Sequence, residues 1–240
     1  LLGLNAPQGA GKTTISRALC ERLERAGKRA LAVSIDDFYY TRQDQLALAT
    51  RFPGNPYLQQ RGYPGTHDLA LGERTLKSLK SAAAGEVSVP RYDKSAHRGQ
   101  GDRLPESAWP KVALPLDFVI VEGWMLGFSP APEGVLPNES FRKINSFLNG
   151  YTAWHRELDG FLQLVPADPR YVLDWRAEAE RKMREEGKGG MSDEEVRAYA
   201  GKFLPAYETY LPVLTANPPA RNNILRIQIG KNRLPTESTV

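Results

Sequence analysis

Short runs of apolar residues, separated by glycine, proline and charged residues, recur along the chain and predict β-strands. Most of these runs are continuous, as in strands that are buried on both faces of a parallel sheet. The last run alternates apolar and polar residues, which is typical of an edge or half-exposed strand. The predicted strands are residues 1–5, 30–35, 118–121, 161–165 and 224–229.

Between the strands, apolar residues return every three or four positions, which is the period of amphipathic helices. This pattern predicts helices over residues 13–26, 68–84 and 170–185. Ser192 and Glu195 fit a capping box that begins a further helix. Strands alternating with helices predict an α/β fold, with a mostly parallel central sheet of about five strands and helices on both faces.

Two long stretches, residues 40–67 and 90–115, show no clear period and are rich in Arg, Gly, Tyr and Pro. Irregular segments of this length inside a compact domain usually carry function. We therefore expect both to be irregular loops that belong to the functional site. No linker-like stretch divides the chain, so residues 1–240 are expected to form a single domain.

Composition and charge restrict the classes of ligand and the compartments that suit the chain. The 240 residues carry a net charge of +4, which suits a small anionic substrate, and no long basic run indicates nucleic acid. No apolar run approaches the ~18 residues of a membrane span. The single cysteine, Cys20, fits a reducing compartment, and we expect it to be buried. We predict a cytoplasmic protein, or one of an organellar stroma if a transit peptide precedes Leu1.

The segment APQGAGKTT, residues 6–14, lies between the first predicted strand and the first predicted helix. It has the Walker A spacing, with Ala6 in the first glycine position, and predicts a loop that binds the phosphates of ATP. Its glycines let backbone N–H groups turn inward, and the helix dipole adds positive potential. The predicted ATP contacts are Gly9, Ala10, Gly11, Lys12, Thr13 and Thr14. In this arrangement Lys12 reaches the β- and γ-phosphates, and the Thr13 hydroxyl binds Mg²⁺.

Acidic residues follow two of the predicted strands, at the sheet edge where α/β proteins bind ligands. Glu122 comes directly after strand 118–121 and is predicted to support Mg²⁺; the alternatives are a helix cap or a surface carboxylate. Asp36 and Asp37 follow strand 30–35, and on an extended chain they point to opposite faces. We predict that Asp36 accepts the proton of an acceptor hydroxyl, with Asp37 as the alternative base. The alternative is that both carboxylates cap a turn and neither acts as a base.

Two segments are rich in basic residues. Residues 90–103 contain four basic and two acidic residues, and guanidinium groups bind carboxylates through paired hydrogen bonds. This segment indicates either a site for a small anionic acceptor or a solvated charge run. Arg181 and Arg184 precede a glycine-rich stretch. They indicate either a lid, near residues 176–192, that places arginines on the transferring phosphoryl group, or an exposed helix end.

Six motifs are together more specific than the Walker A segment alone. They are APQGAGKTT, SIDDFYYT, GTHD, VPRYDKSAHRGQGDR, VEGWMLGF and GMSDEEV…FLPAY…YLP, and the resemblance that they carry runs from residue 3 to about 233. This set resembles the D-glycerate 3-kinase family of plants and related microbes. The resemblance places the chain among the P-loop kinases, beside phosphoribulokinase, uridine kinase and pantothenate kinase, and implies the P-loop NTPase fold. It also implies Mg²⁺- and ATP-dependent phosphorylation of D-glycerate at the 3-hydroxyl, which gives 3-phosphoglycerate and ADP.

The resemblance further implies roles for single residues. Asp36 matches the proposed base of the wider group, which also uses a lid with arginines, here Arg181 and Arg184. The implied acceptor contacts are Arg91, Tyr92 and Lys94 and, more weakly, Arg61, His67 and Arg103.

Two other functions are compatible with the sequence. The first is a P-loop kinase for another small hydroxylated metabolite, for which the basic segment 90–103 favours an anion. The second is a nucleotide-binding regulatory ATPase without a dedicated acceptor. Such a protein would have no use for the long acceptor-like segment.

Overall fold

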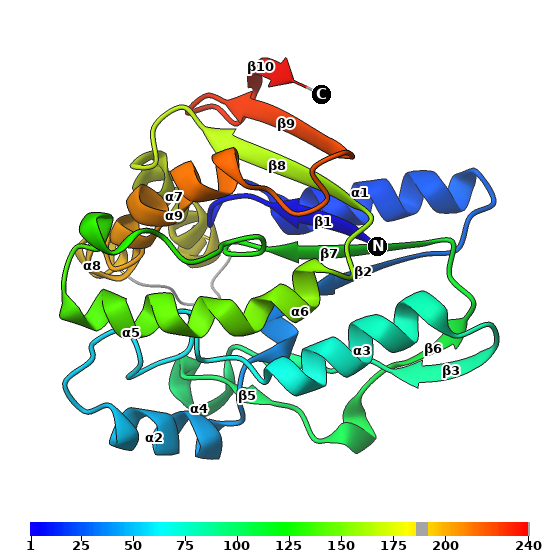
Figure 1. The fold of residues 1–240 in the computed structure, drawn as a ribbon, viewed down its shortest axis with the longest axis horizontal. Coiled ribbons are helices and arrows are strands. Elements are labelled where there is room, and N and C mark those ends of the chain that lie inside the picture. The colour runs from blue at the N-terminus through cyan, green and yellow to red at the C-terminus, as the bar shows by residue number, and fades with distance from the viewer. Residues whose placement is uncertain (186–191, 240) are drawn as a thin grey trace.

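The computed structural model describes residues 1–185 and 192–239, and it contains a central six-stranded sheet (Figure 1). The strands lie in the order β10-β9-β8-β1-β7-β2, and all neighbours are parallel except β10, which runs antiparallel to β9. The bounds are β1 Leu2–Asn5, β2 Ala30–Ser34, β7 Phe118–Gly123, β8 Gly160–Pro166, β9 Ile224–Ile229 and β10 Pro235–Thr239. The five predicted strands and the mostly parallel sheet are confirmed. The sequence PTEST of β10 is polar and gave no strand signal, so the sixth strand was missed.

The two stretches predicted to be irregular contain short regular elements, so that prediction is wrong. Residues 40–67 contain the helix α2 (Arg42–Arg51), which Thr41 caps and which buries no side chain. Residues 90–115 contain parts of two small ladders, β4 (Tyr92–Asp93) with β5 (Asp102–Arg103), and β3 (Gly85–Ser88) with β6 (Lys111–Leu114). Elements this short or this exposed produce no hydrophobic period in the sequence.

Helices cover both faces of the central sheet, as predicted (Figure 1). The longer helices are α1 Lys12–Arg25, α3 Leu69–Ser81, α5 Glu139–Phe147, α7 Tyr171–Glu185, α8 Asp193–Gly201 and α9 Leu204–Ala216. The short helical segments are η1 Ile35–Phe38, α4 Ala96–Gly99, η2 Glu106–Ala108, η3 Glu133–Val135, η4 Leu148–Tyr151 and α6 Thr152–His155. The predicted capping box at the start of α8 is present. None of the helices in the described part of the chain has the length and apolar content that crossing a membrane requires.

The buried side chains form two clusters, one on each face of the sheet. One cluster contains Leu4, Ile120, Leu164 and Ile229 from four strands, together with Trp175 of α7. The larger cluster contains the alternate side chains of the sheet and the buried faces of α3, α5, α6 and α9. The two-residue period of the strands therefore divides the apolar residues between two helical layers.

Cys20 is half-buried, and the expectation that it is buried is wrong. Within α1 only Ser16 is buried, because Ile15, Leu19 and Cys20 pack against the smaller cluster from its margin. The helix thus covers the sheet with a narrow stripe and exposes most of its surface.

We predict that Gly72→Ala destabilises the protein. A Cβ at Gly72 in α3 would lie 2.3 Å from a ring carbon of the buried Trp154, and overpacking of this kind costs about 1–3 kcal/mol. The measurement is the free energy of unfolding from urea titration. Gly201→Ala at the end of α8 is the control, because its Cβ would meet nothing within 4 Å and alanine favours the helix. Equal effects of the two changes would contradict the packing argument.

Candidate active site

The phosphate loop connects β1 to α1. Gly9 and Gly11 have φ values of 79° and 95°, a backbone region that glycine enters without steric cost, and Gly11 is the N-cap of α1. No side chain caps the helix and its first turn contains no acidic residue, so the N-terminal backbone groups stay available to an anion. The Lys12 ammonium donates to the Pro7 carbonyl at 3.2 Å, which places the cation over the loop.

Glu122 ends the apolar part of β7 and lies between the ends of β1 and β2. It pairs with Leu4 on one side and Ser34 on the other. The Thr13 hydroxyl donates to Glu122 Oε1 at 3.3 Å, so these two oxygen atoms lie together at the start of α1. Burial raises the pKa of Glu122, and the nearby Lys12 ammonium opposes this shift. In the described residues no group of three or more His, Cys, Asp and Glu side chains could hold a metal ion.

Asp36 lies in η1, so the expectation that it continues an extended strand is wrong. The strand ends at Ser34, whose hydroxyl accepts from the Asp36 N–H at 3.3 Å and starts the helical turn. The Asp36 carboxylate accepts from the Lys94 ammonium at 2.6 Å. Burial works to raise the pKa of Asp36, but the charge and the hydrogen bond of Lys94, together with the field of Lys12, outweigh it, and the pKa lies below its usual range.

Asp37 has different partners and faces the segment that follows β3. Its carboxylate accepts from the Arg91 guanidinium at 3.0 Å and from the Tyr92 N–H at 3.0 Å. Burial raises the pKa of this carboxyl group in spite of the Arg91 charge. The two adjacent acids thus have separate positions: Asp36 beside Lys94, and Asp37 as an anchor of residues 91–92.

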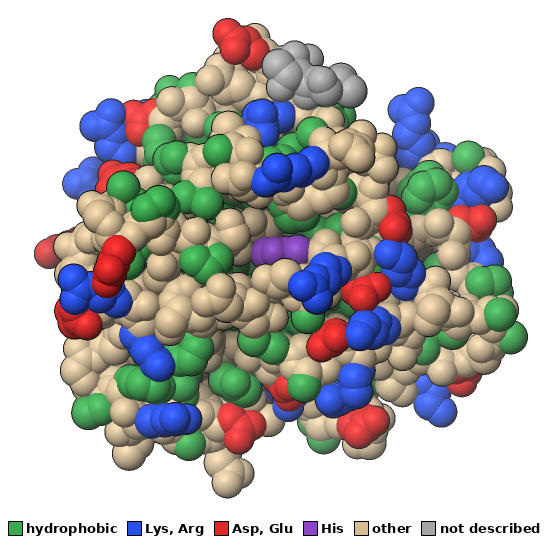
Figure 2. Space-filling model, in the orientation of Figure 1, with side chains coloured by type: hydrophobic (Ala, Val, Ile, Leu, Met, Phe, Trp, Pro, Cys, Tyr) green, Lys and Arg blue, Asp and Glu red, His purple; other side chains and the backbone are tan. Residues whose placement is uncertain are grey.

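Most of the predicted basic acceptor residues contact the protein itself. Arg61 donates to the carbonyls of Gly99, Gln100 and Lys94, and its guanidinium lies 5.4 Å from the centre of the Tyr92 ring. Arg103 donates to Asp68 at 3.2 Å and to the Tyr39 carbonyl at 3.3 Å. These contacts hold residues 90–103, here called the acceptor segment, in their conformation. Acidic and basic side chains are accordingly mixed on the face shown in Figure 2, without a continuous patch of one sign.

Lys94 is the basic acceptor residue that the structure brings to Asp36. Its pKa is raised, because the Asp36 carboxylate outweighs the effect of burial, and Glu122 adds to the shift. Lys12 experiences the fields of the same two acids, although burial lowers its pKa. The structure therefore gathers Lys12, Thr13, Asp36, Lys94 and Glu122 at one end of the sheet.

His67 is 1% exposed and stacks on the Tyr39 ring at a centroid distance of 4.2 Å. Its Nδ1 lies 2.7 Å from the Tyr151 hydroxyl, which also accepts from the Gly65 N–H at 3.1 Å. Nδ1 and this hydroxyl share one hydrogen bond, whose direction follows the tautomer of the ring. Burial lowers the pKa of His67 to about 3, so the ring is neutral and contributes no positive charge to the site.

Sequence reasoning assigned no role to three aromatic residues near these groups, although all three lie in the quoted motifs. Tyr39 carries the stacked ring of His67, and Asp36 raises its pKa in addition to burial. The Tyr207 hydroxyl accepts from the Gln8 N–H at 3.0 Å and joins α9 to the phosphate loop. Trp124 packs against Tyr207 with ring centres 5.3 Å apart, two residues after Glu122. These residues form an aromatic wall beside the charged groups.

The two predicted lid arginines lie on α7 away from this cluster. Arg184 donates to Asp193 at 2.9 Å, and Arg181 lies 4.0 Å from the same carboxylate, which belongs to α8. The predicted lid spans residues 176–192, of which residues 186–191 lie outside the described part of the chain. The described contacts do not bring Arg181 and Arg184 to Lys12 or Asp36.

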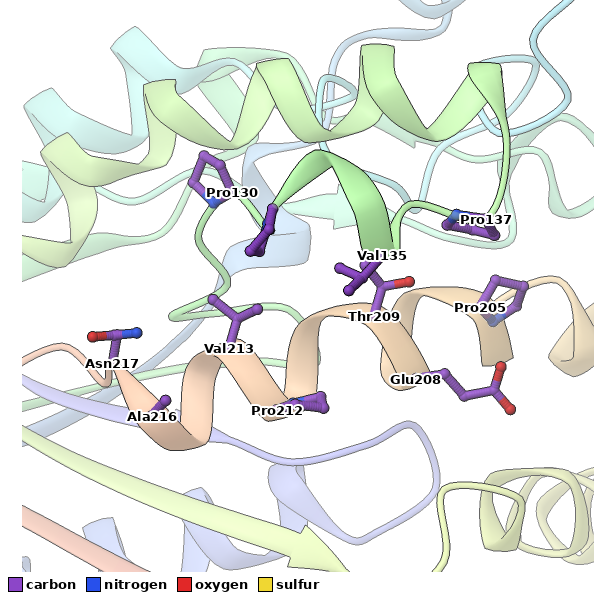
Figure 3. A pocket seen from close by; sticks show the side chains of 11 residues that line it. Pro130, Val135, Pro137, Pro205, Glu208, Thr209, Pro212, Val213, Ala216 and Asn217 are labelled. Carbon is purple, nitrogen blue, oxygen red and sulfur yellow. The ribbon is translucent and has the colours of Figure 1, made fainter.

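A groove of about 720 Å³ lies between residues 130–137 and α9 (Figure 3). Its lining includes Pro130, Val135, Pro205, Pro212 and Val213, with Glu208 as its charged side chain. It contains none of the predicted site residues. A phosphorylated ligand needs cationic or N–H donor groups, so we do not assign ATP or an anionic acceptor to this groove.

Comparison with known proteins shows similarity to kinases over nearly all of this chain, which spans about half the length of the first of these relatives. The chain is 42% identical over 243 residues to the D-glycerate 3-kinase, chloroplastic, of Arabidopsis thaliana, an alignment that covers 98% of this chain and 53% of the relative. The structure of D-glycerate 3-kinase from Cryptococcus neoformans superposes with a TM-score of 0.90 at 33% identity, over 99% of this chain and 88% of the other. Phosphoribulokinase from Rhodobacter spheroides shares the fold, with a TM-score of 0.53 at 14% identity, over 96% of this chain and 70% of that enzyme. No protein-family model matches the chain.

We predict that the protein loses stability as the pH falls from about 6.5 toward 4. Burial lowers the pKa of His155 from 6.5 to about 4, and its Nε2 must stay unprotonated to accept from the Gly127 N–H at 3.0 Å. His67 is shifted in the same direction. A depressed pKa in the folded state means that the unfolded chain takes up the proton first, so the stabilisation is complete above pH 6.5 and is lost below it.

His155→Gln tests this interpretation. A glutamine oxygen can accept from the Gly127 N–H but does not titrate. Between pH 6.5 and 5 the variant should lose about 1–2 kcal/mol less unfolding free energy than the parent, as measured by urea titration at each pH. Parallel stability curves for the two proteins would show that His155 is not responsible.

Proposed function

The chain belongs to the D-glycerate 3-kinase family, and on this premise we propose that it transfers the γ-phosphoryl group of ATP to the 3-hydroxyl of D-glycerate. The products are 3-phosphoglycerate and ADP. The observation that carries the proposal is the ion pair of Asp36 with Lys94, 2.6 Å long, next to Lys12 of the phosphate loop. This arrangement combines the ionised carboxylate of Asp36, a cation, Lys94, for an acidic acceptor, and a loop for the phosphates of ATP.

Asp36 is our candidate for the general base. Its lowered pKa keeps the carboxylate ionised near neutral pH, and an ionised oxygen can accept the proton of the attacking 3-hydroxyl. The proton moves to Asp36 as the hydroxyl oxygen bonds to the γ-phosphorus and the bond to the ADP oxygen breaks. Positioning the hydroxyl for in-line attack is the larger part of this work.

Lys94 is our candidate for contact with the carboxylate of D-glycerate. Its side chain is 59% exposed while it pairs with Asp36, so a second anion can approach it. Arg61, Arg91, Tyr92 and Arg103 would hold the acceptor segment in shape through the contacts described above. Neutral His67 would hold Tyr39 in place beside Asp36 through the stacking of the two rings.

Thr13 and Glu122 fit a Mg²⁺ ion that accompanies ATP. Both present oxygen atoms, which Mg²⁺ prefers, and they lie 3.3 Å apart at the phosphate loop. Two protein oxygens suit an ion whose remaining ligands are phosphate and water. When bound, the ion would neutralise charge on the β- and γ-phosphates. Arg181 and Arg184 remain our candidates for stabilising the charge on the transferring phosphoryl group. They would have to leave Asp193 to reach it.

A reducing compartment suits this chain. Its single cysteine, Cys20, is free, and the Arabidopsis relative is named as chloroplastic. We propose the cytoplasm or an organellar stroma as its location.

We predict that D-glycerate stimulates ADP release from Mg-ATP by at least about tenfold over the rate without acceptor, because the hydroxyl is then placed for attack. The measurement is coupled ADP detection with D-glycerate, L-glycerate and a panel of other small hydroxy acids, sugar phosphates and nucleosides. Stimulation by another compound but not by D-glycerate would assign a different acceptor. Slow ADP release that no compound stimulates would favour a regulatory ATPase.

We predict that Asp36→Asn lowers kcat for D-glycerate at least ~100-fold, the usual scale for a lost general base. ATP binding should persist, because the loop amides and Lys12 are unchanged. Asp37→Asn is the matched control: it removes an adjacent carboxylate that anchors Arg91 and Tyr92, and should change KM for the acceptor more than kcat. Nearly normal turnover of Asp36→Asn would assign the base elsewhere, with Asp37 as the next candidate.

A further inference from the structure

The turn between β9 and β10 lies against the phosphate loop, although more than 200 residues separate them in the sequence. The turn is closed by hydrogen bonds from the Gly230 N–H to the Leu234 carbonyl at 3.0 Å and from the Arg233 N–H to the Gly230 carbonyl at 2.9 Å. Arg233 has a φ of 63°, a left-handed conformation that non-glycine residues seldom adopt. Such a conformation persists where surrounding contacts hold it.

The Arg233 side chain contacts the phosphate loop and two residues of α7 at once. Its Nε donates to the Gly9 carbonyl of the phosphate loop at 2.9 Å. Its Nη1 lies 2.8 Å from Glu178 of α7, and the guanidinium lies 5.6 Å from the centre of the Trp175 ring. The side chain is only 30% exposed, which strengthens these interactions relative to those of a surface arginine.

Trp175 completes the connection. Its indole N–H donates to the Lys231 carbonyl at 2.7 Å, and the side chain is 1% exposed. A Cβ on Gly9 would lie 2.7 Å from the Trp175 Cβ, so the loop and α7 are in direct contact. The phosphate loop, the turn and the N-terminal half of α7 therefore form one packed unit.

We propose that Arg233 is a positioning residue for the nucleotide. By holding the Gly9 carbonyl, it fixes the peptide plane between Gly9 and Ala10, whose N–H donates to the Pro7 carbonyl at 3.2 Å, and with it the course of the loop that presents the following N–H groups to the phosphates. An N–H group fixed in advance binds an anion without the cost of ordering the loop. The inference rests on the proposed function for the identity of the ligand, ATP, but not for the identity of the acceptor.

This role predicts a selective effect. Any nucleotide that places a β-phosphate in the loop gains from the ordered N–H groups, so ATP and ADP should be affected alike. D-glycerate should not be affected, because Asp36 follows β2 at one edge of the sheet whereas the turn joins β9 and β10 at the other. A residue that touched the γ-phosphate directly would instead discriminate between ATP and ADP.

The test is Arg233→Met, which keeps an apolar stem over Trp175 and removes the donor. Binding of Mg-ATP and Mg-ADP to the full chain is measured by calorimetry without acceptor, so that the result does not depend on which compound is phosphorylated. We expect Kd for both nucleotides to rise about tenfold, the order expected for one lost charge-assisted hydrogen bond. KM for D-glycerate should stay within about twofold. Arg233→Lys keeps the charge and can still donate to Gly9, so it should recover most of the affinity.

Lys231→Met is the matched control. It removes a cation from the same turn together with an ion pair to α7, at 2.8 Å from Asp174, but its side chain has no described contact with the phosphate loop. Its nucleotide affinity should stay within about twofold of the parent. Equal losses of nucleotide affinity in Lys231→Met and Arg233→Met would show that the affinity depends on net charge alone, and would overturn the proposal. Unchanged affinity in Arg233→Met, or a loss for ATP alone, would overturn it as well.

If Arg233→Met fails to fold, Arg233→Gly decides the matter through hydrogen exchange, because glycine adopts the left-handed φ at this position and removes the donor. The proposal requires faster exchange of the amides of residues 9–11 than in the parent, with the amides of β1 unchanged. Equal protection of residues 9–11 in Arg233→Gly and the parent would contradict a positioning role.

Discussion

The parallel register of β1, β7 and β2 is the constraint on which the candidate site depends. It sets Glu122 opposite both Leu4 and Ser34, so three strands end together at the phosphate loop, at the acid for which we propose a role in Mg²⁺ binding and at the turn that carries Asp36. A strand advances about 3.3 Å per residue, and a shift of two residues keeps the buried faces but moves a strand end by roughly 7 Å. The apolar alternation that divides the core between two helical layers excludes only odd shifts of register, so the site depends on the exact pairing of these three strands.

Charges at this edge are arranged in opposite pairs. Lys12 lies in the field of Glu122 and Asp36, and Lys94 contacts Asp36 directly. Unpaired, the buried carboxylate of Glu122 would cost several kcal/mol to desolvate, and the partly buried Lys12 and Asp36 would lose part of their hydration. On binding an anionic substrate, Lys12 and Lys94 would exchange the protein carboxylates for negative groups of the substrate. The site is therefore complementary to anions, and its cations still have partners when no substrate is bound.

Local signals in the sequence were sufficient for five strands, for the helices α1, α3, α7 and α8, for the phosphate loop and for the capping box at Ser192. They failed where contacts distant in the sequence decide the outcome, as in α5, α9 and the turn at Asp36, which the Ser34 hydroxyl draws into a short helix. The backbone carbonyls of residues 94–100 engage Arg61, for which the family resemblance implies a substrate contact that stays a prediction. The polar strand β10 and the contact of Arg233 with Gly9 had no signal, because both depend on a neighbour that folding supplies.

The burial of His67 has a consequence for the response of the site to acidity. Burial keeps this ring neutral, the pKa of Asp36 lies below its usual range, and that of Lys94 lies above. Across the neutral range, these three groups thus hold a constant charge. A histidine at such a position would ordinarily act as a proton sensor. Here burial suppresses its protonation, and the groups around Asp36 present the same field in mildly acidic and mildly alkaline surroundings.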